Sequence, residues 1–292
     1  MGPNEILRSV EDSGYKEEIA SMGIGKQSIA SIEIALNKNL VRTFKKLQTI
    51  SDDRLRAVIG IYLYKYDLSN IKTIIRGKFT KISNNEIIGL LSPSINYPQE
   101  YFTDLVKKDS ISEIIEELEI DVPNDASLAK IENVIDTKYF DKLFELTRML
   151  RGQGQALKKF IEAELDILNL KLILRSKHEK IKINLIHPRT EIKDIAKLEN
   201  IKEIAAAINK LGFAKLPTDV SEKEIILNAE IELDKGLLKK EALLMHQYPL
   251  TVNVILGYLF AKEIEVKNLK ILLKGRTLGI EDDIIHKLVV VA

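Results

Sequence analysis

The sequence contains no cysteine, which excludes disulfide bonds, thiolate metal ligands and cysteine nucleophiles. Proline is scarce, with 7 residues in 292, and each proline falls at a break between segments of helical apolar periodicity. The 4 histidines are scattered, and none stands at a metal-ligand spacing from another. The longest apolar candidate, Pro249 to Ala261, is shorter than the roughly 20 residues that a membrane span needs. These absences predict a chain with no metal site and no direct membrane span.

Charge of one sign is not in excess either. Lys and Arg total 44 and Asp and Glu total 43, for a formal net charge of +1, so nothing global favours nucleic acid as a partner. There is no phosphate-binding loop of the type G-x-x-x-x-G-K-[ST], and no acid and base pair stands out. We therefore expect no cofactor, no catalytic residue and no enzyme activity.

What the sequence does contain is helical periodicity. Leu, Ile, Lys and Glu dominate, and apolar residues recur at steps of three and four. Capping-box pairs predict helix starts at Ser83 with Glu86, Ser110 with Glu113 and Ser221 with Glu224. Strand-type alternation is nearly absent, so we predict an all-α fold.

One helical signature occurs three times in the sequence. It reads DLSNIKTIIRGK from Asp67 to Lys78, DILNLKLILRSK from Asp166 to Lys177, and EVKNLKILLKGR from Glu265 to Arg276. The asparagines are 99 residues apart in both intervals (169 − 70 and 268 − 169). Such self-similarity indicates three copies of one supersecondary unit. A weaker echo lies upstream, at Ile32-Glu33, Ile131-Glu132 and Ile231-Glu232.

The repeat divides the chain into three predicted helical units, with boundaries near 105 and 200 in loops rich in Pro, Asn and Asp. Unit one covers residues 1–105, unit two 106–200 and unit three 201–292. Short helices beginning near Glu5, Ser110 and Ile201 resemble the opening of each unit.

The acidic and amide positions of the signature recur in every copy. They are Asp67 and Asn70, Asp166 and Asn169, and Glu265 and Asn268. One interpretation is a shared contact surface. The favoured interpretation is structural: each asparagine hydrogen-bonds a backbone group where two helices cross, because buried amides need partners.

The basic positions of the signature form like-charged pairs one helical turn apart. They are Lys72 and Arg76, Lys171 and Arg175, and Lys270 and Lys274. Such pairs cost a few tenths of a kcal/mol on an isolated helix, which suggests an acidic counterpart on a neighbouring helix or on a partner protein. The alternative is a solvated face, with Lys78, Lys177 and Arg276 favourably placed near the helix C-termini. These six pair residues are the candidate partner interface.

Three segments resemble the C subunit of archaeal-type rotary ATP synthases, which is related to the d subunit of V-type ATPases. They are the first signature preceded by NLVRTFKKLQ at Asn39 to Gln48, the middle signature, and the run PLTVNVILGYLFAKEIEVKNLKILLKGRTLGI from Pro249. The resemblance covers nearly the whole chain. It implies three pseudo-equivalent helical lobes forming a funnel, and a non-catalytic coupler that joins the central-shaft subunits to the membrane rotor ring. It also implies a peripheral protein on the cytoplasmic face of the cell membrane, monomeric in isolation.

One departure from that family concerns the first unit. Family members usually carry a further N-terminal helix, whereas this chain opens with EILRSVEDSGYKEE, which resembles the interior of unit one. Either the sequence is truncated or it is a short form of the family, and in both cases we expect unit one to lack its N-terminal helix. The alternative function is a helical-repeat adaptor unrelated to ATP synthesis, for which three units suffice. A nucleic-acid scaffold is disfavoured, because acidic residues lie inside the same signature.

Overall fold

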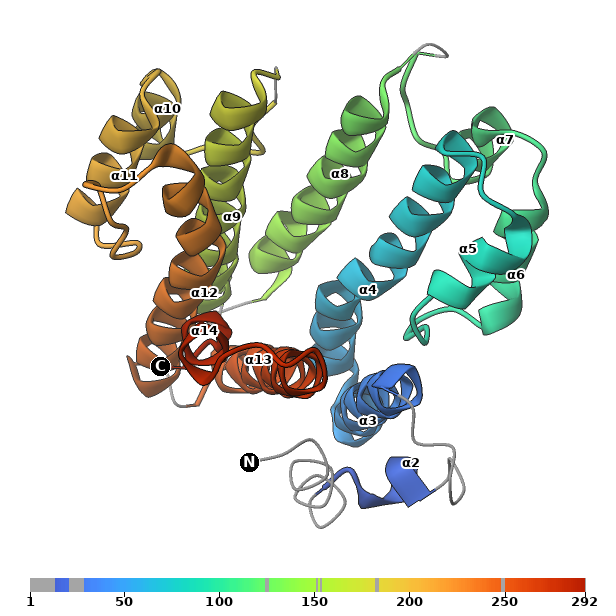
Figure 1. Cartoon of the computed structure of the whole chain (residues 1–292). Helices are drawn as coiled ribbons and strands as arrows, with labels where there is room; N and C mark the ends of the chain where they lie inside the picture. The colour runs from blue at the N-terminus through green and yellow to red at the C-terminus, as the bar shows by residue number, and fades with distance from the viewer. Residues whose placement is uncertain are drawn as a thin grey trace. The chain divides into compact units, whose positions relative to one another are not determined.

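Figure 1 shows the computed structural model of the protein, which describes residues 14–20, 29–123, 126–150, 152, 154–181, 184–247 and 250–291. Within these residues the backbone forms helices, turns and bends, and no strand. The prediction of an all-α fold is therefore confirmed. Its physical basis is the near absence of proline from the periodic segments, since an interior proline removes a helical hydrogen bond.

Among the described residues, six helices have 22 residues or more, and the others have ten or fewer. In chain order the helices are α2 (Lys16–Ala20), α3 (Ile29–Ile50), α4 (Asp53–Phe79), α5 (Asn84–Leu90), α6 (Gln99–Lys107), α7 (Ile111–Glu117), α8 (Leu128–Met149), α9 (Gly154–Glu179), α10 (Thr190–Ala196), α11 (Ile201–Lys210), α12 (Glu222–Gln247), α13 (Val252–Thr277) and α14 (Asp282–Leu288).

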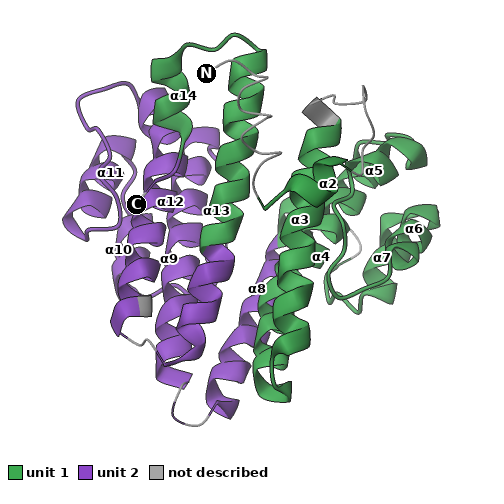
Figure 2. Ribbon diagram, turned by 90° about the horizontal axis from the view of Figure 1, so that it is seen from below, with its two compact units in different colours: residues 1–132, 261–289 green, residues 133–260, 290–292 purple. Residues whose placement is uncertain are grey.

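The chain divides into two compact units, which Figure 2 distinguishes by colour. The first compact unit comprises residues 1–132 and 261–289, and the second comprises residues 133–260 and 290–292. Helices α8 and α13 each contribute residues to both. This division reflects contacts in space rather than the sequence repeat, so the three helical units with boundaries near 105 and 200 stay a prediction.

The six long helices form three consecutive pairs, α3 with α4, α8 with α9 and α12 with α13. In each pair the signature occupies the C-terminal part of the second helix. Its final cations, Lys78, Lys177 and Arg276, therefore lie in the last turn, where a positive charge favourably meets the helix dipole. The repeat seen in the sequence is thus a repeat of a helix pair.

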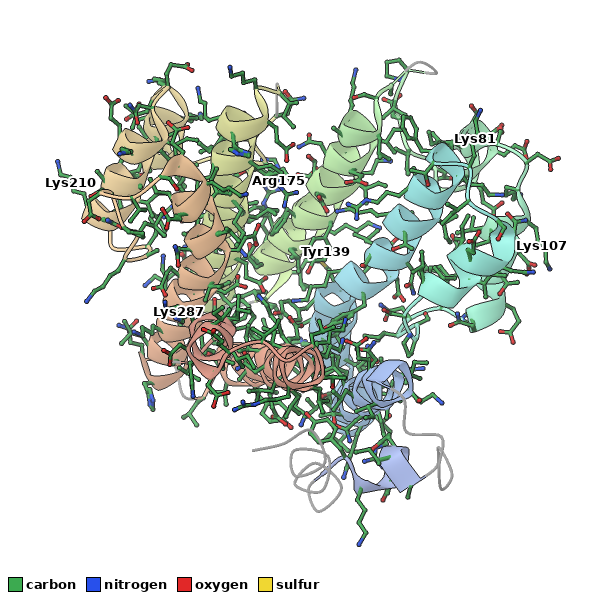
Figure 3. The ribbon with its side chains drawn as sticks, in the orientation of Figure 1. Lys81, Lys107, Tyr139, Arg175, Lys210 and Lys287 are labelled. Atoms are coloured by element: carbon green, nitrogen blue, oxygen red, sulfur yellow. The ribbon has the colours of Figure 1, made fainter. Side chains whose placement is uncertain are left out.

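The three signature helices also end in the same way. A residue in the left-handed backbone region follows each of them: Lys81 with φ 58°, Lys180 with φ 54° and Gly279 with φ 68°. The next backbone N–H, from Ile82, Ile181 or Ile280, returns to a carbonyl five residues back at 2.9–3.2 Å. This is the Schellman ending, which satisfies carbonyls that the helix leaves open. Figure 3 labels Lys81 at the end of α4.

Two short helices pack closely on the signature helices that precede them. In the first copy Ile87 of α5 lies against Gly77 of α4, and in the third copy Ile285 of α14 lies against Gly275 of α13. A Cβ atom on Gly77 would come within 2.5 Å of Ile87, and one on Gly275 within 2.8 Å of Ile285. Glycine is therefore required for this approach. The middle copy carries Ser176 at the same position.

Pairs of short helices follow the first and second copies, α6 with α7 and α10 with α11. Ser110 caps α7 and Asn200 caps α11, each by accepting a backbone hydrogen bond. The helix starts predicted near Ser110 and Ile201 are thus confirmed, as are those at Ser83 and Ser221. The start predicted near Glu5 lies outside the described residues.

The close approach of α5 to α4 can be tested by adding one methyl group. Gly77→Ala should destabilise the protein by up to about 2 kcal/mol, because overpacking costs about 1–3 kcal/mol and alanine regains about 1 kcal/mol of helix propensity. Gly89→Ala is the matched control, since nothing lies within 4 Å of its added Cβ atom. Urea denaturation gives both values. Equal stability of the two variants would contradict the packing argument.

Candidate functional site: contacts made by the repeated signature

The asparagine of the signature clamps the chain segment that follows its helix. The Asn70 amide accepts a hydrogen bond from Ser92 N at 2.9 Å and donates one to Ser92 O at 3.0 Å. Asn169 repeats this arrangement on Ile186, at 2.9 Å and 2.8 Å. Both asparagines are buried. The backbone hydrogen bond expected of the asparagine is present in these two copies, but it is made to connecting segments and not at a helix crossing.

The acidic position anchors the same segment in the first copy. The buried carboxylate of Asp67 accepts hydrogen bonds from Ser94 Oγ (2.8 Å), Ile95 N (3.1 Å), Asn96 N (3.1 Å) and Asn96 Nδ2 (2.8 Å). A carboxylate can be buried at acceptable cost only when its oxygens are satisfied in this way. Asp67 and Asn70 together fix the course of residues 92–96.

In the second copy the acidic position uses an ion pair instead. Arg189 donates to Asp166 from Nε at 3.1 Å and from Nη2. Burial raises the pKa of Asp166, and the hydrogen bond and charge of Arg189 oppose that rise. Burial alone would lower the pKa of Arg189, but Asp166 outweighs it and the net change is upward. The pair holds the start of α10 against α9.

The third copy departs from this pattern. Glu265 is exposed, accepts a hydrogen bond from the Tyr15 hydroxyl at 2.6 Å and pairs with Lys262 at 2.8 Å. Asn268 is half-buried on α13. In the first and second copies the acidic residue therefore bonds to its own copy, whereas in the third it accepts a hydrogen bond from Tyr15, which is far away in the sequence.

The basic half of the signature contacts the first long helix of the following copy. In the first copy, Arg76 of α4 donates to both carboxylate oxygens of Glu132 on α8, at 2.5 Å and 2.7 Å. This forked geometry suits an arginine and a carboxylate. Lys72 is half-buried one turn earlier on α4. The contact lies within the first compact unit.

The second copy makes the equivalent contact with α12, inside the second compact unit. Lys171 pairs with Asp234 at 2.6 Å and with Glu230 at 3.2 Å, and Arg175 reaches Glu230 at 3.5 Å. Lys171 and Asp234 are largely buried, with side-chain exposures of 21% and 14%. Figure 3 labels Arg175 on α9.

The third copy turns back to the first long helix of the chain. Lys274 pairs with Glu33 of α3 at 2.8 Å, and Lys270 donates to Asn37 at 2.7 Å. Burial lowers the pKa of Lys270, and the charge of Lys274 lowers it further against the opposing pull of Glu33. Lys65 of α4 with Glu263 of α13 adds a second ion pair between these copies, at 2.9 Å. All of these residues belong to the first compact unit.

Within the chain, these contacts run from the first copy to the second, from the second to the third, and from the third to the first. Their acidic members Glu33 and Glu132 belong to the upstream echo in the sequence, but the contact with α12 uses Glu230 and not Glu232, which pairs with Lys235 on its own helix. The three outer cations, Arg76, Arg175 and Lys274, keep 54–61% of their side chains exposed. They can therefore hold the fold and still face another molecule.

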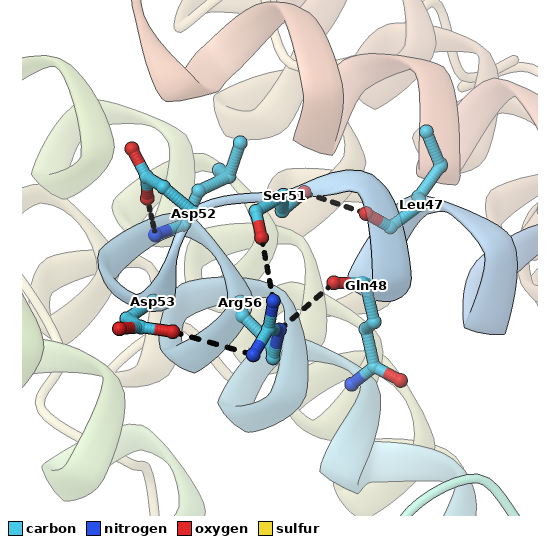
Figure 4. A network of polar contacts seen from close by, with 7 residues as sticks. Leu47, Gln48, Ser51, Asp52, Asp53 and Arg56 are labelled. Atoms are coloured by element: carbon cyan, nitrogen blue, oxygen red, sulfur yellow. Dashed lines mark hydrogen bonds and ion pairs between the residues drawn. The ribbon is translucent and has the colours of Figure 1, made fainter.

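A polar network that the sequence did not indicate fixes the turn between α3 and α4 (Figure 4). Arg56 donates to Gln48 O at 3.1 Å, to Ser51 O at 2.9 Å and to Asp53 Oδ1 at 3.3 Å. Asp52 caps α4 through Leu55 N. Arg56 has no counterpart at the 99-residue spacing, where Gln155 stands, so the repeat gave no signal for it.

Neither a metal site nor a membrane-spanning helix is found in the described part of the chain. There, no group of three His, Asp or Glu side chains is placed to hold a metal ion. No helix in that part combines the length and the hydropathy that a membrane crossing requires.

The fold and these contacts define an all-helical repeat protein whose copies are joined by ion pairs. Residues 1–288 match the model of the ATP synthase (C/AC39) subunit family, and the chain belongs to that family. It is therefore a subunit of a rotary ATP synthase, and its partners are other subunits of that complex.

Curated relatives support the assignment over the full length. A protein of Methanococcoides burtonii named as the C subunit of A-type ATP synthase is 30% identical, with 100% of this chain and 87% of the relative covered. Proteins of the same name from Methanosarcina mazei (29% identical, 100% and 86% covered) and Haloferax volcanii (26%, 98% and 88%) are also similar. The resemblance seen in the sequence is confirmed.

The amide clamps predict a specific loss of stability. Asn169→Ala leaves the Ile186 N–H and C=O groups buried without partners, so we expect a loss of about 1–3 kcal/mol in unfolding free energy. The control is Asn228→Ala, whose amide donates to Glu224 O one turn back on the same helix, and which should change stability by less than about 0.5 kcal/mol. Thermal denaturation compares them. A cost for Asn169→Ala no larger than the control's would exclude the clamp.

The contact from the first copy to the second can be tested by exchanging its charges. Arg76→Glu and Glu132→Arg should each destabilise the protein, and the double exchange should recover most of that loss, with a coupling of about 1 kcal/mol. Exchanging Lys107 and Asp104, an exposed pair within α6, is the matched control and should show weaker coupling. Additive effects of Arg76→Glu and Glu132→Arg would contradict a stabilising pair.

Proposed function

We propose that this protein is a non-catalytic central-stalk subunit that couples the central shaft of a rotary A-type or V-type ATP synthase to its membrane rotor ring. It would sit as a peripheral protein on the cytoplasmic face of the membrane and pass torque between ATP turnover and ion transport. The observation that carries the proposal is the family match over residues 1–288. The funnel formed by three lobes is part of this proposal.

The contacts described above support a mechanical role. A coupler must resist deformation when one partner turns relative to the other. The first two signature helices are bonded both to their own copy and to the next, and the third is bonded to the first copy. In the first copy, the buried Asp67 and Asn70 hydrogen-bond the segment that follows their own helix, and Arg76 pairs with Glu132 of the next copy. Close-packed helices transmit strain because protein interiors are poorly compressible. Nothing in this role requires a catalytic residue or a cofactor.

The six cations of the signature remain the proposed partner interface. The outer cation of each copy pairs within the chain and keeps more than half of its side chain exposed, so an acidic partner surface can reach it. The inner cation Lys171 is mostly buried, which favours a structural role at that position. We therefore place the recognition role on Arg76, Arg175 and Lys274 in particular.

The test is a pulldown of the purified chain with the central-shaft subunits and the detergent-solubilised rotor ring of the same organism. We expect binding to both. Binding to neither, with the chain folded by circular dichroism, would overturn the coupling role and favour a helical-repeat adaptor. Size-exclusion chromatography with light scattering of the chain alone should give the mass of a monomer.

Charge exchange separates the structural role of Arg76 from recognition. Arg76→Glu reverses the exposed charge and breaks the pair with Glu132, whereas Arg76→Glu with Glu132→Arg reverses the same charge and restores a pair. If Arg76 contacts a partner, both variants should bind at least tenfold more weakly than the unmodified chain. Recovery of binding in the exchanged variant would assign Arg76 to the fold alone. Lys107→Glu is the surface-charge control.

A further inference from the structure

A cavity in the second compact unit has a composition that none of the contacts above explains. It lies between α9, the start of α10, the end of α11 and the C-terminal half of α12, and has a volume of about 440 Å³. This is within the range of about 300–1,000 Å³ typical of small-molecule sites. All of its lining residues are described and belong to one compact unit.

The floor of the cavity is apolar and its edge is only partly covered. Ile167, Phe213 and Leu237 form the floor and are at most 9% exposed. Leu211 and Leu243 line the same cavity but are 43% and 56% exposed. Exposing large apolar side chains to water is unfavourable, by about 25 cal/mol for each Å² of apolar surface that could be buried. A hydrocarbon group would cover them.

Positive charge surrounds this apolar floor. Arg189, Lys239 and Lys240 line the cavity, against the single acid Glu191. Asp166 pairs with Arg189, and Lys240 lies near enough for its charge to act on the same carboxylate, but neither lysine has a salt bridge to any described residue. The Lys240 ammonium lies 5.2 Å from the centre of the Phe213 ring, at the apolar floor itself.

The backbone around the cavity depends on two glycines. Gly212, with φ 74°, ends α11 in the left-handed region. Gly236 of α12 faces the Phe213 carbonyl so closely that an added Cβ atom would come within 1.8 Å of its oxygen. This approach brings the segment after α11 onto α12 and places Phe213 in the floor. A side chain at residue 236 would force that segment away.

The repeat does not account for these features. At the spacing of 100 residues that separates Ile131-Glu132 from Ile231-Glu232, the positions equivalent to Lys239 and Lys240 are Tyr139 and Phe140, and Asp136 stands at the position of Gly236. The cavity is therefore particular to this part of the chain and is not required by the helix pair that all three copies share.

We propose that this cavity binds an amphiphilic anion, a single hydrocarbon chain carrying a carboxylate or phosphate head group. The hydrocarbon chain of the ligand covers Ile167, Phe213 and Leu237, and Lys239 and Lys240 contact its head group. The two lysines, which form no salt bridge with a described residue, favour an anion over a neutral head group, and the apolar floor favours an acyl chain over a hydrophilic phosphate. The cavity shares Ile167 and Arg189 with the second signature and its ion pair, but Lys239 and Lys240 lie outside the signature, and the proposal does not depend on the coupling role.

The experiment is isothermal titration of the full chain with decanoate below its micelle concentration. We expect saturable binding of one decanoate per chain, weaker at high salt, with decyl phosphate behaving alike and decanol binding at least tenfold more weakly. Equal affinities for decanol and decanoate would show that the lysines do not recognise the head group, and would contradict an anion site. Absence of saturable binding would overturn the proposal.

Matched variants locate the site. Lys239→Glu with Lys240→Glu should weaken decanoate binding at least tenfold, and Leu243→Glu should also weaken it, because it places a charge on the exposed apolar edge. The control, Lys202→Glu with Lys210→Glu on α11, changes the same charge outside the cavity (Figure 3 labels Lys210). Equal losses in both double variants would show non-specific attraction and overturn the site.

A vesicle arm distinguishes a free amphiphile from a lipid in a membrane. Vesicles of phosphatidylglycerol and of phosphatidylcholine are sedimented with the chain and with its Lys239→Glu, Lys240→Glu variant. Decanoate binding together with charge-dependent sedimentation would identify membrane lipid as the source, and decanoate binding alone would identify a free amphiphile. Sedimentation without decanoate binding would contradict the cavity as the site.

Discussion

Charge pairing between consecutive copies is the interaction on which the rest of this protein depends. Each signature helix carries two cations one turn apart, which repel each other unless an acid is near. The chain supplies those acids on the first long helix of the next copy. The contact from the second copy to the third is the most extensive, with Lys171 between Asp234 and Glu230. The contact from the third copy to the first is less charged, since Lys270 meets the neutral Asn37, and Lys65 with Glu263 reinforces it.

The two halves of the signature make different contacts. Its acidic half holds the chain of its own copy, through Asp67 and Asn70 in the first copy and Asp166 and Asn169 in the second, while its basic half holds the next copy. A single helix thus joins the local fold to the neighbouring one. A shaft coupler needs this property, because a force on one copy must reach the others through groups that are already paired.

Much of this organisation could be predicted from the sequence, because repetition and helical period are local signals. They indicated the all-α fold, a supersecondary unit repeated three times and the backbone hydrogen bonds of Asn70 and Asn169. They could not choose between a neighbouring helix and a partner protein for the cations, since that depends on which segments meet in space. The Arg56 network and the Lys65 pair occur once each, so no repeat revealed them. The glycine contact at residue 236 needed the fold itself.

The proposed coupling role requires the copies to stay joined while the complex turns. The absence of cysteine allows a direct test, in which Glu33→Cys and Lys274→Cys are bridged by a short, cleavable thiol cross-linker in the reconstituted complex of the same organism. ATP-driven ion transport is then measured before and after cleavage. A rigid coupler predicts full transport with the bridge intact. Transport that stops when the bridge forms and returns when it is cleaved would show that these copies must separate, and would contradict the account.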